Sequence, residues 1–223
     1  EKALDTAINS GAKDCVSFDN YHEIITEKED FYKVKNKMIL NINNFIYSNI
    51  EWRPFQLNPN TPITGLDRAF YLRAKFGTDE QVSKMQETIR LAGLKENIPF
   101  LFHHINKIPN TMLSHRLINW SYQFGKQDTV VEQIFLSYFR DGKDIGDINV
   151  LIDISDASGL NHQETKTRLN SNKGFSDTLN KMDEARSLGI TSVPCFIFNG
   201  KYALYGAHEP ETLFKVFDLL AVN

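Results

Sequence analysis

Residues 192–202 read SVPCFIFNGKY, and they carry the strongest structural signal in the chain. The run from 190 to 198 is rich in residues that favour β-strands, with one proline, Pro194, inside it. Asn199-Gly200 is the residue pair that most strongly indicates a β-hairpin. The pattern therefore predicts a strand that ends at 198, a tight turn, and a second strand at 201–205.

Helical patterns flank this hairpin. Apolar residues at helical spacing span 175–188 and stop at Gly189, a residue type that commonly follows a helix. Pro210 stands at the first turn of another apolar pattern, which runs to residue 220. We therefore expect the hairpin to lie between two helices.

Residues 66–169 are predicted to be helical almost throughout. Capping residues and glycines divide the apolar pattern into segments at 67–76, 78–93, 110–125, 128–138, 147–158 and 162–169. The methionine and aromatic positions in these segments are expected to pack a core rather than to hold a cofactor.

The beginning of the chain has a more varied pattern. Residues 50–57 alternate apolar and polar side chains and predict a strand, at the edge of a sheet because of Pro54. Helical patterns cover 1–9 and 31–50. The charged residues between 12 and 30 predict an exposed linker or insertion.

Composition excludes several classes of protein. The 223 residues carry 25 Lys and Arg against 28 Asp and Glu, unlike a nucleic-acid-binding surface. Hydrophobic residues make up 41%, as in a globular protein, but no apolar run approaches the roughly 20 residues of a membrane span. The two cysteines, Cys15 and Cys195, are too few for a disulfide framework or a zinc module. We therefore expect a cytoplasmic protein that binds neither nucleic acid nor membrane.

The order of these elements predicts an α/β fold in which an all-helical domain is inserted into a sheet domain. Residues 1–65 are expected to form the first part of the sheet domain, with an insertion at about 12–49. Residues 66–174 form the helical domain, and residues 175–223 return to the sheet domain.

Several stretches of the chain resemble a known family. Residues 192–202, with the turn at 206–211, are similar to the second half of a thioredoxin fold. Residues 52–59 (WRPFQLNP), 109–118 and 138–147 resemble the DsbA-like oxidoreductases of the FrnE type. This resemblance covers nearly all of residues 50–223, and it implies a thioredoxin-like mixed sheet with a large helical insertion.

The same resemblance implies an activity, thiol–disulfide exchange. In this family a first strand leads into a C-x-x-C motif at the start of the first helix, where backbone N–H groups and the helix dipole stabilise a thiolate. No such motif occurs in the 223 residues, and residue 1 is Glu rather than Met. We therefore expect the first strand and the catalytic cysteines upstream of Glu1, and no catalytic residue within this chain.

The resemblance also implies a substrate-binding site around Pro194. Its peptide bond is expected to be cis, which turns the backbone of Val193 outward to pair with an extended peptide or with glutathione. Ser192 lies beside this contact. Cys195 is either a small hydrophobe of the strand or an auxiliary thiol near the site.

A second group of candidate residues lies at the start of the helix predicted near residue 110. Asn110 and Thr111 are either a helix cap or part of the substrate groove, and His115 follows one turn later as a groove residue or an ordinary histidine. His103 and His104 are adjacent and have no third ligand at a useful spacing, so we expect no metal site.

Two alternative functions stay open. Related proteins of the kappa class, which includes 2-hydroxychromene-2-carboxylate isomerase, have a serine in place of the cysteine and use glutathione as co-substrate. The other alternative is a non-catalytic binding module. We expect no cofactor besides glutathione, and as partners a disulfide-containing protein or small molecule, with a homodimer as an open alternative.

The position of the expected first strand has a structural consequence. In the family that strand lies between the strands predicted at 50–57 and 190–198. Without it, both would expose unpaired N–H and C=O groups, so residues 1–223 alone are expected to be loosely folded or prone to aggregation.

Overall fold

The computed structural model describes residues 14–17, 22–25, 50–208, 212–213 and 215–217. The chain divides into two compact units, one formed by residues 1–50 with 208–223 and the other by 51–207. Three predictions lie wholly or largely outside the described residues. They are the helix over 1–9, the helix over 31–50 and the start of the last helix at Pro210.

A short hairpin belongs to the first unit. β1 (Asp14–Ser17) pairs antiparallel with β2 (His22–Ile25). This hairpin lies within the linker or insertion expected over 12–30 and was not predicted from the sequence, although the stretch contains the β-branched residues Val16, Ile24 and Ile25.

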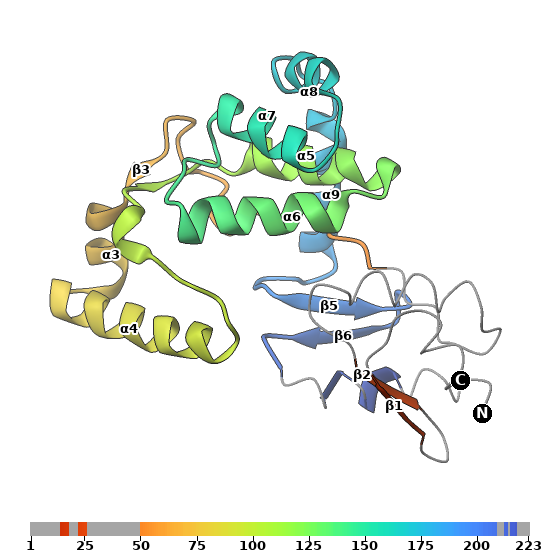
Figure 1. Ribbon diagram of the computed structural model, residues 1–223. Helices are drawn as coiled ribbons and strands as arrows, with labels where there is room; N and C mark the ends of the chain where they lie inside the picture. The colour runs from red at the N-terminus through yellow and green to blue at the C-terminus, as the bar shows by residue number, and fades with distance from the viewer. Residues whose placement is uncertain (1–13, 18–21, 26–49, 209–211, 214, 218–223) are drawn as a thin grey trace. The chain divides into compact units, whose positions relative to one another are not determined.

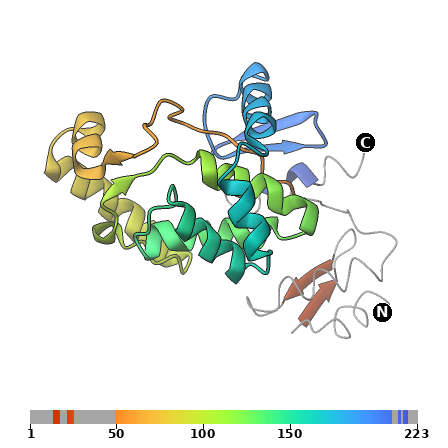
Figure 2. The ribbon, with the colours of Figure 1, turned by 90° about the horizontal axis from the view of Figure 1, so that it is seen from above.

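Helices make up most of the second unit (Figure 1, Figure 2). They are α3 (Arg68–Phe76), α4 (Asp79–Lys95), α5 (Met112–Ser121), α6 (Gln127–Phe135), α7 (Ile148–Ala157), α8 (His162–Leu169) and α9 (Phe175–Ser187). Each overlaps a segment that was predicted to be helical, although α4 continues two residues beyond its segment and α6 begins one residue before its own. Thr78 begins α4 with a capping box, in which its hydroxyl accepts from the Gln81 N–H and the Gln81 side chain accepts from the Thr78 N–H. None of the helices in the described residues is long and apolar enough to cross a membrane.

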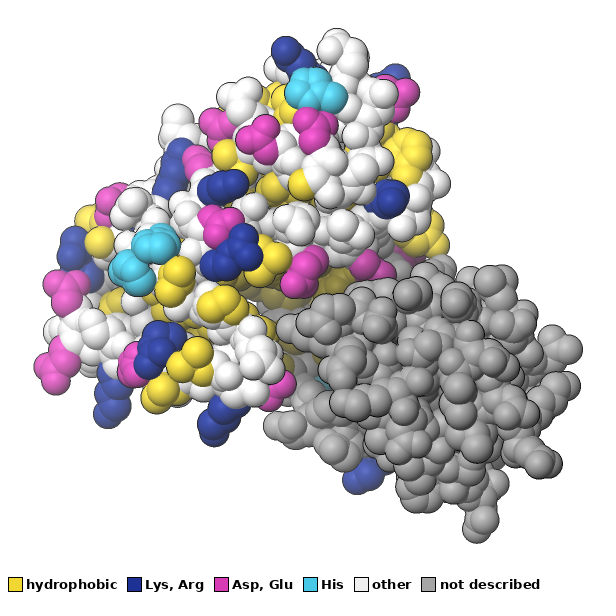
Figure 3. Space-filling model, in the orientation of Figure 1, with side chains coloured by type: hydrophobic (Ala, Val, Ile, Leu, Met, Phe, Trp, Pro, Cys, Tyr) yellow, Lys and Arg dark blue, Asp and Glu magenta, His cyan; other side chains and the backbone are white. Residues whose placement is uncertain are grey.

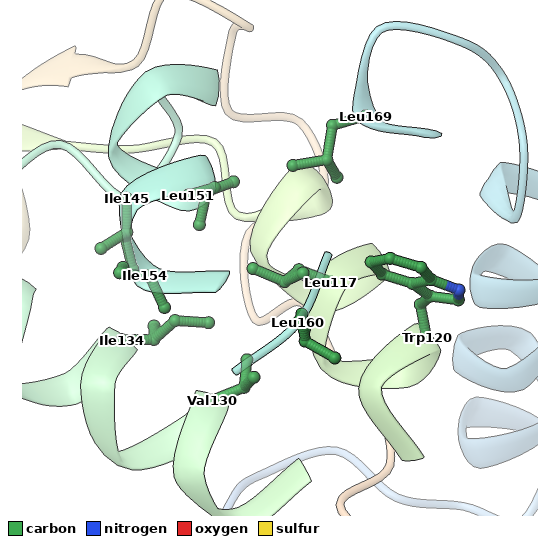
Figure 4. Packing of buried hydrophobic residues seen from close by; sticks show 9 residues of the cluster. All are labelled: Leu117, Trp120, Val130, Ile134, Ile145, Leu151, Ile154, Leu160 and Leu169. Carbon is green, nitrogen blue, oxygen red and sulfur yellow. The ribbon is translucent and has the colours of Figure 1, made fainter. Parts of the chain in front are cut away.

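A single apolar cluster joins α5, α6, α7 and α8 (Figure 4). Leu117, Val130 and Leu151, from three of these helices, have no exposed surface. The other members are Trp120, Ile134, Ile145, Ile154, Leu160 and Leu169. The helical part of the chain therefore has a hydrophobic core of its own.

The helix that starts with α6 ends in a widened turn. Residues Leu136–Arg140 form a π-helical turn, and the Asp141 N–H donates to the carbonyl of Leu136, 3.1 Å away. The carbonyl of Phe139 in this turn accepts from the backbone N–H of Leu101 (2.9 Å). The wide turn thus holds the segment that leads from α4 back to the helical core.

Two pairs of strands complete the second unit. β3 (Leu66–Asp67) pairs with β4 (Lys107–Ile108), and β5 (Cys195–Phe198) pairs with β6 (Tyr202–Tyr205), both antiparallel. The predicted hairpin is confirmed, and its turn residues, Asn199 and Gly200, have φ values of 50° and 68°. The β3–β4 pair was missed because two-residue strands leave no periodic pattern in the sequence.

The strand predicted at 50–57 does not form; these residues have no regular secondary structure. The side chain of Gln127 takes the place of a strand partner. Its Oε1 accepts from the Trp52 N–H (2.8 Å), and its Nε2 donates to the Trp52 carbonyl (3.0 Å). The prediction was wrong because alternation describes the faces of a strand, whereas a strand also needs a neighbouring strand to pair with.

Candidate functional site

The loop between α9 and β5 carries the first group of candidate residues. The Val193–Pro194 peptide bond is cis. Ser192, Val193 and Pro194 are all exposed, and 46% of the surface of Val193 is accessible. The loop therefore presents its backbone and side chains to solvent at the point where β5 begins.

The pairing of β5 with β6 determines which backbone groups of β5 remain open. The Gly206 N–H donates to the Pro194 carbonyl (2.8 Å), and this bond continues the register in which Phe196 lies opposite Leu204. In an antiparallel pair every second residue directs its N–H and C=O toward its partner strand. Phe196 therefore faces β6, and the backbone groups of Cys195 and Ile197 point to the other edge.

Cys195 is half-buried and is a free thiol. Burial raises the pKa of this thiol above its ordinary value. Nucleophilic cysteines instead need a lowered pKa, because the thiolate is the reactive form. Cys195 is thus a protonated thiol at neutral pH and lacks the activation of a catalytic cysteine.

The second group of candidate residues lies at the start of α5. Asn110 uses both ends of its amide: Oδ1 accepts from the Met112 N–H (3.0 Å), and Nδ2 donates to the carbonyl of Thr61 (2.6 Å). The hydroxyl of Thr111 accepts from the buried Gln56 side chain at 3.4 Å. Thr111 is the N-cap residue of α5, Asn110 just before it accepts from the first N–H of the helix, and both side chains hold the segment at 56–61 against this helix start.

His115 lies on α5, one turn after Thr111, and is half-buried. Burial lowers the pKa of its imidazole to about 4. The ring is therefore neutral at neutral pH, able to donate one hydrogen bond and accept another. It carries no charge with which to attract an anion.

The two groups lie on different elements of the second unit, and α5 packs against α9, the helix that precedes Pro194. Among the described residues, no hydrogen bond joins Ser192, Val193 or Pro194 to the residues at the start of α5. The hydrogen bonds hold each group in place separately.

A shallow hollow of about 320 Å³ adjoins the second group. It is lined by residues 57–61, Leu66 and Tyr71, and the side-chain amide of Asn58 donates to the Tyr71 hydroxyl across it (2.8 Å). Thr61, which accepts from Asn110, is one of its lining residues. A small polar ligand would find amide, hydroxyl and carbonyl groups here.

Charged side chains and possible metal ligands are spread out in the described part of the molecule. The described residues contain no cluster of His, Cys, Asp or Glu that could hold a metal ion. On the face seen in Figure 3, acidic and basic side chains are interspersed, with apolar side chains between them. Such a mixed surface does not steer a highly charged ligand.

The sequence did not single out Arg116, the side chain of α5 that makes the most hydrogen bonds. It is 5% exposed, and its guanidinium donates to the backbone carbonyls at the end of α8 and just after it, those of Arg168, Leu169, Ser171 and Lys173. An arginine on an apolar helix face is the available signal, because such a residue is buried only when it has many partners.

Comparison with protein families identifies the fold. A family model described as the DSBA-like thioredoxin domain matches residues 34–218. This range includes the candidate residues of both groups.

Curated relatives match the chain in part. An uncharacterized protein, YwbO, of Bacillus subtilis is 25% identical over 149 residues, which are 66% of this chain and 70% of that protein. A probable transcriptional regulatory protein of Pelagibacter ubique, SAR11_0592, is 43% identical over 54 residues, 24% of this chain. The match spans only 22% of the length of that relative.

Solved structures of similar fold are described as disulfide oxidoreductases or isomerases. A probable DsbA oxidoreductase, SCO1869, of Streptomyces coelicolor has a TM-score of 0.69 at 21% identity, over 75% of this chain and 73% of that one. A putative protein disulfide isomerase of Nitrosomonas europaea has a TM-score of 0.54 at 14% identity, over 64% and 74% of the two chains. At these identities the likeness concerns the fold.

Proposed function

Because the chain belongs to the family of the DSBA-like thioredoxin domain, we propose that it is the substrate-binding part of a thiol–disulfide oxidoreductase or isomerase of the FrnE type. The observation that carries this proposal is the exposed loop of Ser192, Val193 and Pro194 at the point where β5 begins. An extended substrate can hydrogen-bond to exposed backbone of this kind, as in other cases of strand addition.

The proposed reaction uses two cysteines from a C-x-x-C motif upstream of Glu1. The first, as a thiolate, attacks a sulfur of the substrate disulfide; that S–S bond breaks, and the other substrate sulfur leaves as a thiolate. The second cysteine then attacks the mixed disulfide and releases the first substrate sulfur. The substrate gains two electrons, and the cysteine pair is left oxidised.

The residues of this chain would bind and orient the substrate. Val193 would pair with its backbone, while Ser192 and Pro194 shape the loop that presents Val193. Asn110, Thr111 and the neutral His115 would line the neighbouring surface with hydrogen-bonding groups and no charge. The raised pKa of Cys195 favours a bystander role over a nucleophilic one. A cytoplasmic location fits the scarcity of cysteine in the chain.

The test is disulfide reduction by the polypeptide encoded from the natural start codon of its gene. We expect Pro194→Ala to lower kcat/KM for a peptide disulfide at least about tenfold, since about 1.4 kcal/mol of binding corresponds to that factor. Pro99→Ala, a change of an exposed loop proline away from both groups of candidate residues, serves as the control and should leave kcat/KM unaltered.

The same assay separates the alternatives. Trapping of a mixed disulfide on an upstream cysteine would support the proposal. Turnover that depends on glutathione and involves no cysteine of the protein would replace it with the glutathione-dependent isomerase or transferase. Binding without any turnover would leave a non-catalytic module.

A further inference from the structure

The turn between β5 and β6 holds a pair of residues whose chemistry the proposed function does not use. Asn199 and Gly200 are both exposed, and no other asparagine in the 223 residues is followed by glycine. The amide carbon of an asparagine side chain can be attacked by the backbone nitrogen of the next residue, which closes a five-membered ring. Glycine hinders this attack least, because it has no Cβ.

Both reacting groups of this pair are free in the part of the chain that the structure describes. No hydrogen bond holds the side-chain amide of Asn199 or the N–H of Gly200 there. The turn is closed instead by the N–H of Lys201, which donates to the Phe198 carbonyl (3.0 Å). Apart from its chain neighbours, no atom would lie within 4 Å of a Cβ added at Gly200. The nitrogen and the amide carbon can therefore meet without displacing other groups.

Asn170 and Ser171 provide a contrast within the same unit. Serine is also a small residue, but here both reacting groups are bound. The Asn170 side-chain amide donates to the Lys166 carbonyl (2.8 Å), and the Ser171 N–H donates to the Arg168 carbonyl (3.2 Å). These two bonds must break before the nitrogen can reach the amide carbon. The structure thus distinguishes a free pair from a held one.

We propose that Asn199 is a site of spontaneous deamidation. The backbone nitrogen of Gly200 forms a bond to the side-chain amide carbon of Asn199, and the side-chain nitrogen takes up the proton of that N–H and leaves as ammonia. Water then adds to one of the two carbonyl carbons of the ring, and the bond from that carbon to nitrogen breaks. The products are aspartate and isoaspartate. One water is consumed, one ammonia is released, and no atom changes its oxidation state.

The conformation of the turn determines when the reaction occurs. Asn199 and Gly200 have φ values of 50° and 68°, which place both in the left-handed region of this turn. The ring requires different backbone angles at Asn199, so the tip of the hairpin must open first. Local opening is typical of exposed loop tips, which have few buried contacts. We therefore expect deamidation to be slower in the folded protein than in the unfolded chain, but still measurable.

The product should alter the hairpin that carries the candidate loop. In isoaspartate the main chain runs through the former side chain and is longer by one CH₂ group. The bond between Lys201 and Phe198 that closes the turn should then be lost, and the adjacent pair of Phe198 and Tyr202 should weaken. Since β5 follows Pro194 directly, the modification changes the strand next to the exposed loop.

Peptide mass spectrometry tests the proposal on the polypeptide encoded from the natural start codon, incubated in mildly alkaline buffer. A Ser171→Gly variant carries two Asn-Gly pairs, so that the difference between them reports the structure and not the sequence. In this folded variant Asn199 should convert at least about tenfold faster than Asn170, which corresponds to about 1.4 kcal/mol in the barrier. In urea the two sites should convert at similar rates. Equal rates in the folded variant, or conversion of Asn199 in urea alone, would overturn the proposal.

Amide exchange after the incubation tests the effect on the hairpin. The amides of Lys201 and Tyr202 should exchange faster in the aged parent than in the fresh one. Asn199→Gly is the matched control, because it removes the reactive amide and glycine accepts a φ of 50° without strain. Its exchange should not change with time. Isoaspartate at position 199 with unaltered exchange would show that the turn tolerates the longer chain and would overturn this effect.

Discussion

The helical core and the β5–β6 hairpin belong to the same unit of the chain but differ in how they are covered. In the core, Leu117, Val130 and Leu151 have no exposed surface. In the hairpin, Ile197 and Tyr202 expose 47% and 51% of theirs. The stability of this unit therefore resides in the helices, while the hairpin carries the candidate chemistry. The difference teaches that burial is concentrated in the helices, while the candidate residues around Pro194 lie beside a hairpin with much exposed surface.

The largest loss of stability is expected from truncating a side chain in the apolar core. We expect Leu151→Ala to lower the free energy of unfolding by about 3–4 kcal/mol, because it removes buried methyl groups and leaves a cavity. Leu91→Ala, in the half-exposed position of another helix, should cost less than about 1 kcal/mol. Urea titration measures both, and equal losses would contradict the idea that the core dominates stability.

Removing the guanidinium of Arg116 should have the next largest effect. Arg116→Met keeps the apolar stem but leaves the carbonyls at and after the end of α8 without their donor, at a cost of about 3 kcal/mol. Amide exchange should speed up at residues 168–174, at the end of α8 and after it, more than within α5. Arg53→Met breaks an exposed ion pair with Glu184 and should change stability by less than about 1 kcal/mol. Unchanged exchange at 168–174 would show that Arg116 does not hold this turn.

A pH titration probes the same helix through His115. Its pKa is about 4 in the folded protein against 6.5 as the ordinary value, so the unfolded chain binds the extra proton first. The stability that the neutral His115 ring contributes is fully present above about pH 6.5 and is lost as the pH falls toward 4. At pH 5 the free energy of unfolding should already be lower by about 2 kcal/mol. His115→Gln should flatten the stability profile between these values. A parent profile that is flat already would contradict a buried neutral ring.

A smaller loss of stability is expected when the contact between Gln127 and the backbone of Trp52 is removed. Gln127→Leu conserves volume but leaves the N–H and C=O of Trp52 without a partner, at a cost of about 1–2 kcal/mol. The amide of Trp52 should then exchange faster. Gln133→Leu, half-buried on the same helix, is the control. If the Trp52 amide is as protected in the Gln127 variant as in the parent, another group supports this segment.

The smallest effect is expected in the hairpin itself. Tyr202→Ala should change the unfolding free energy of the second unit by less than about 1 kcal/mol, because this residue is 51% exposed. Thermal unfolding followed by circular dichroism provides the measurement. A loss as large as that of Leu151→Ala would mean that the hairpin is an integral part of the core, and the contrast between the two regions would fail.

The features that could be predicted from the sequence are those set by nearby residues. The start of α4 at Thr78 depends on Gln81, three positions away, and the turn at Asn199-Gly200 depends on those two residues alone. Such signals lie within a few positions of the elements they define. These local signals predicted the helices and the hairpin, and therefore also the position of Pro194 at the start of β5.

The features that could not be predicted depend on distant partners. Gln127 binds Trp52 across 75 positions, and Arg116 reaches Arg168 across 52. Nothing near residue 52 in the sequence shows that its backbone will pair with a side chain instead of a strand. For the candidate site, the residue types at 110, 111 and 115 were evident, but the bracing role of Asn110 and the burial of His115 required the folded structure.

The π-helical turn at Leu136–Arg140 bears on which changes of chain length this protein can accept. A π turn contains one residue more than an α-helical turn. Deleting a residue there would restore a regular helix but rotate everything that follows by about 100°. Asp144 would then lose its contact with Lys107, and the carbonyl of Ile145 its bond to Ser114. Single-residue deletions at this turn should therefore be tolerated far less well in a library of variants than deletions in the exposed segment at 96–99.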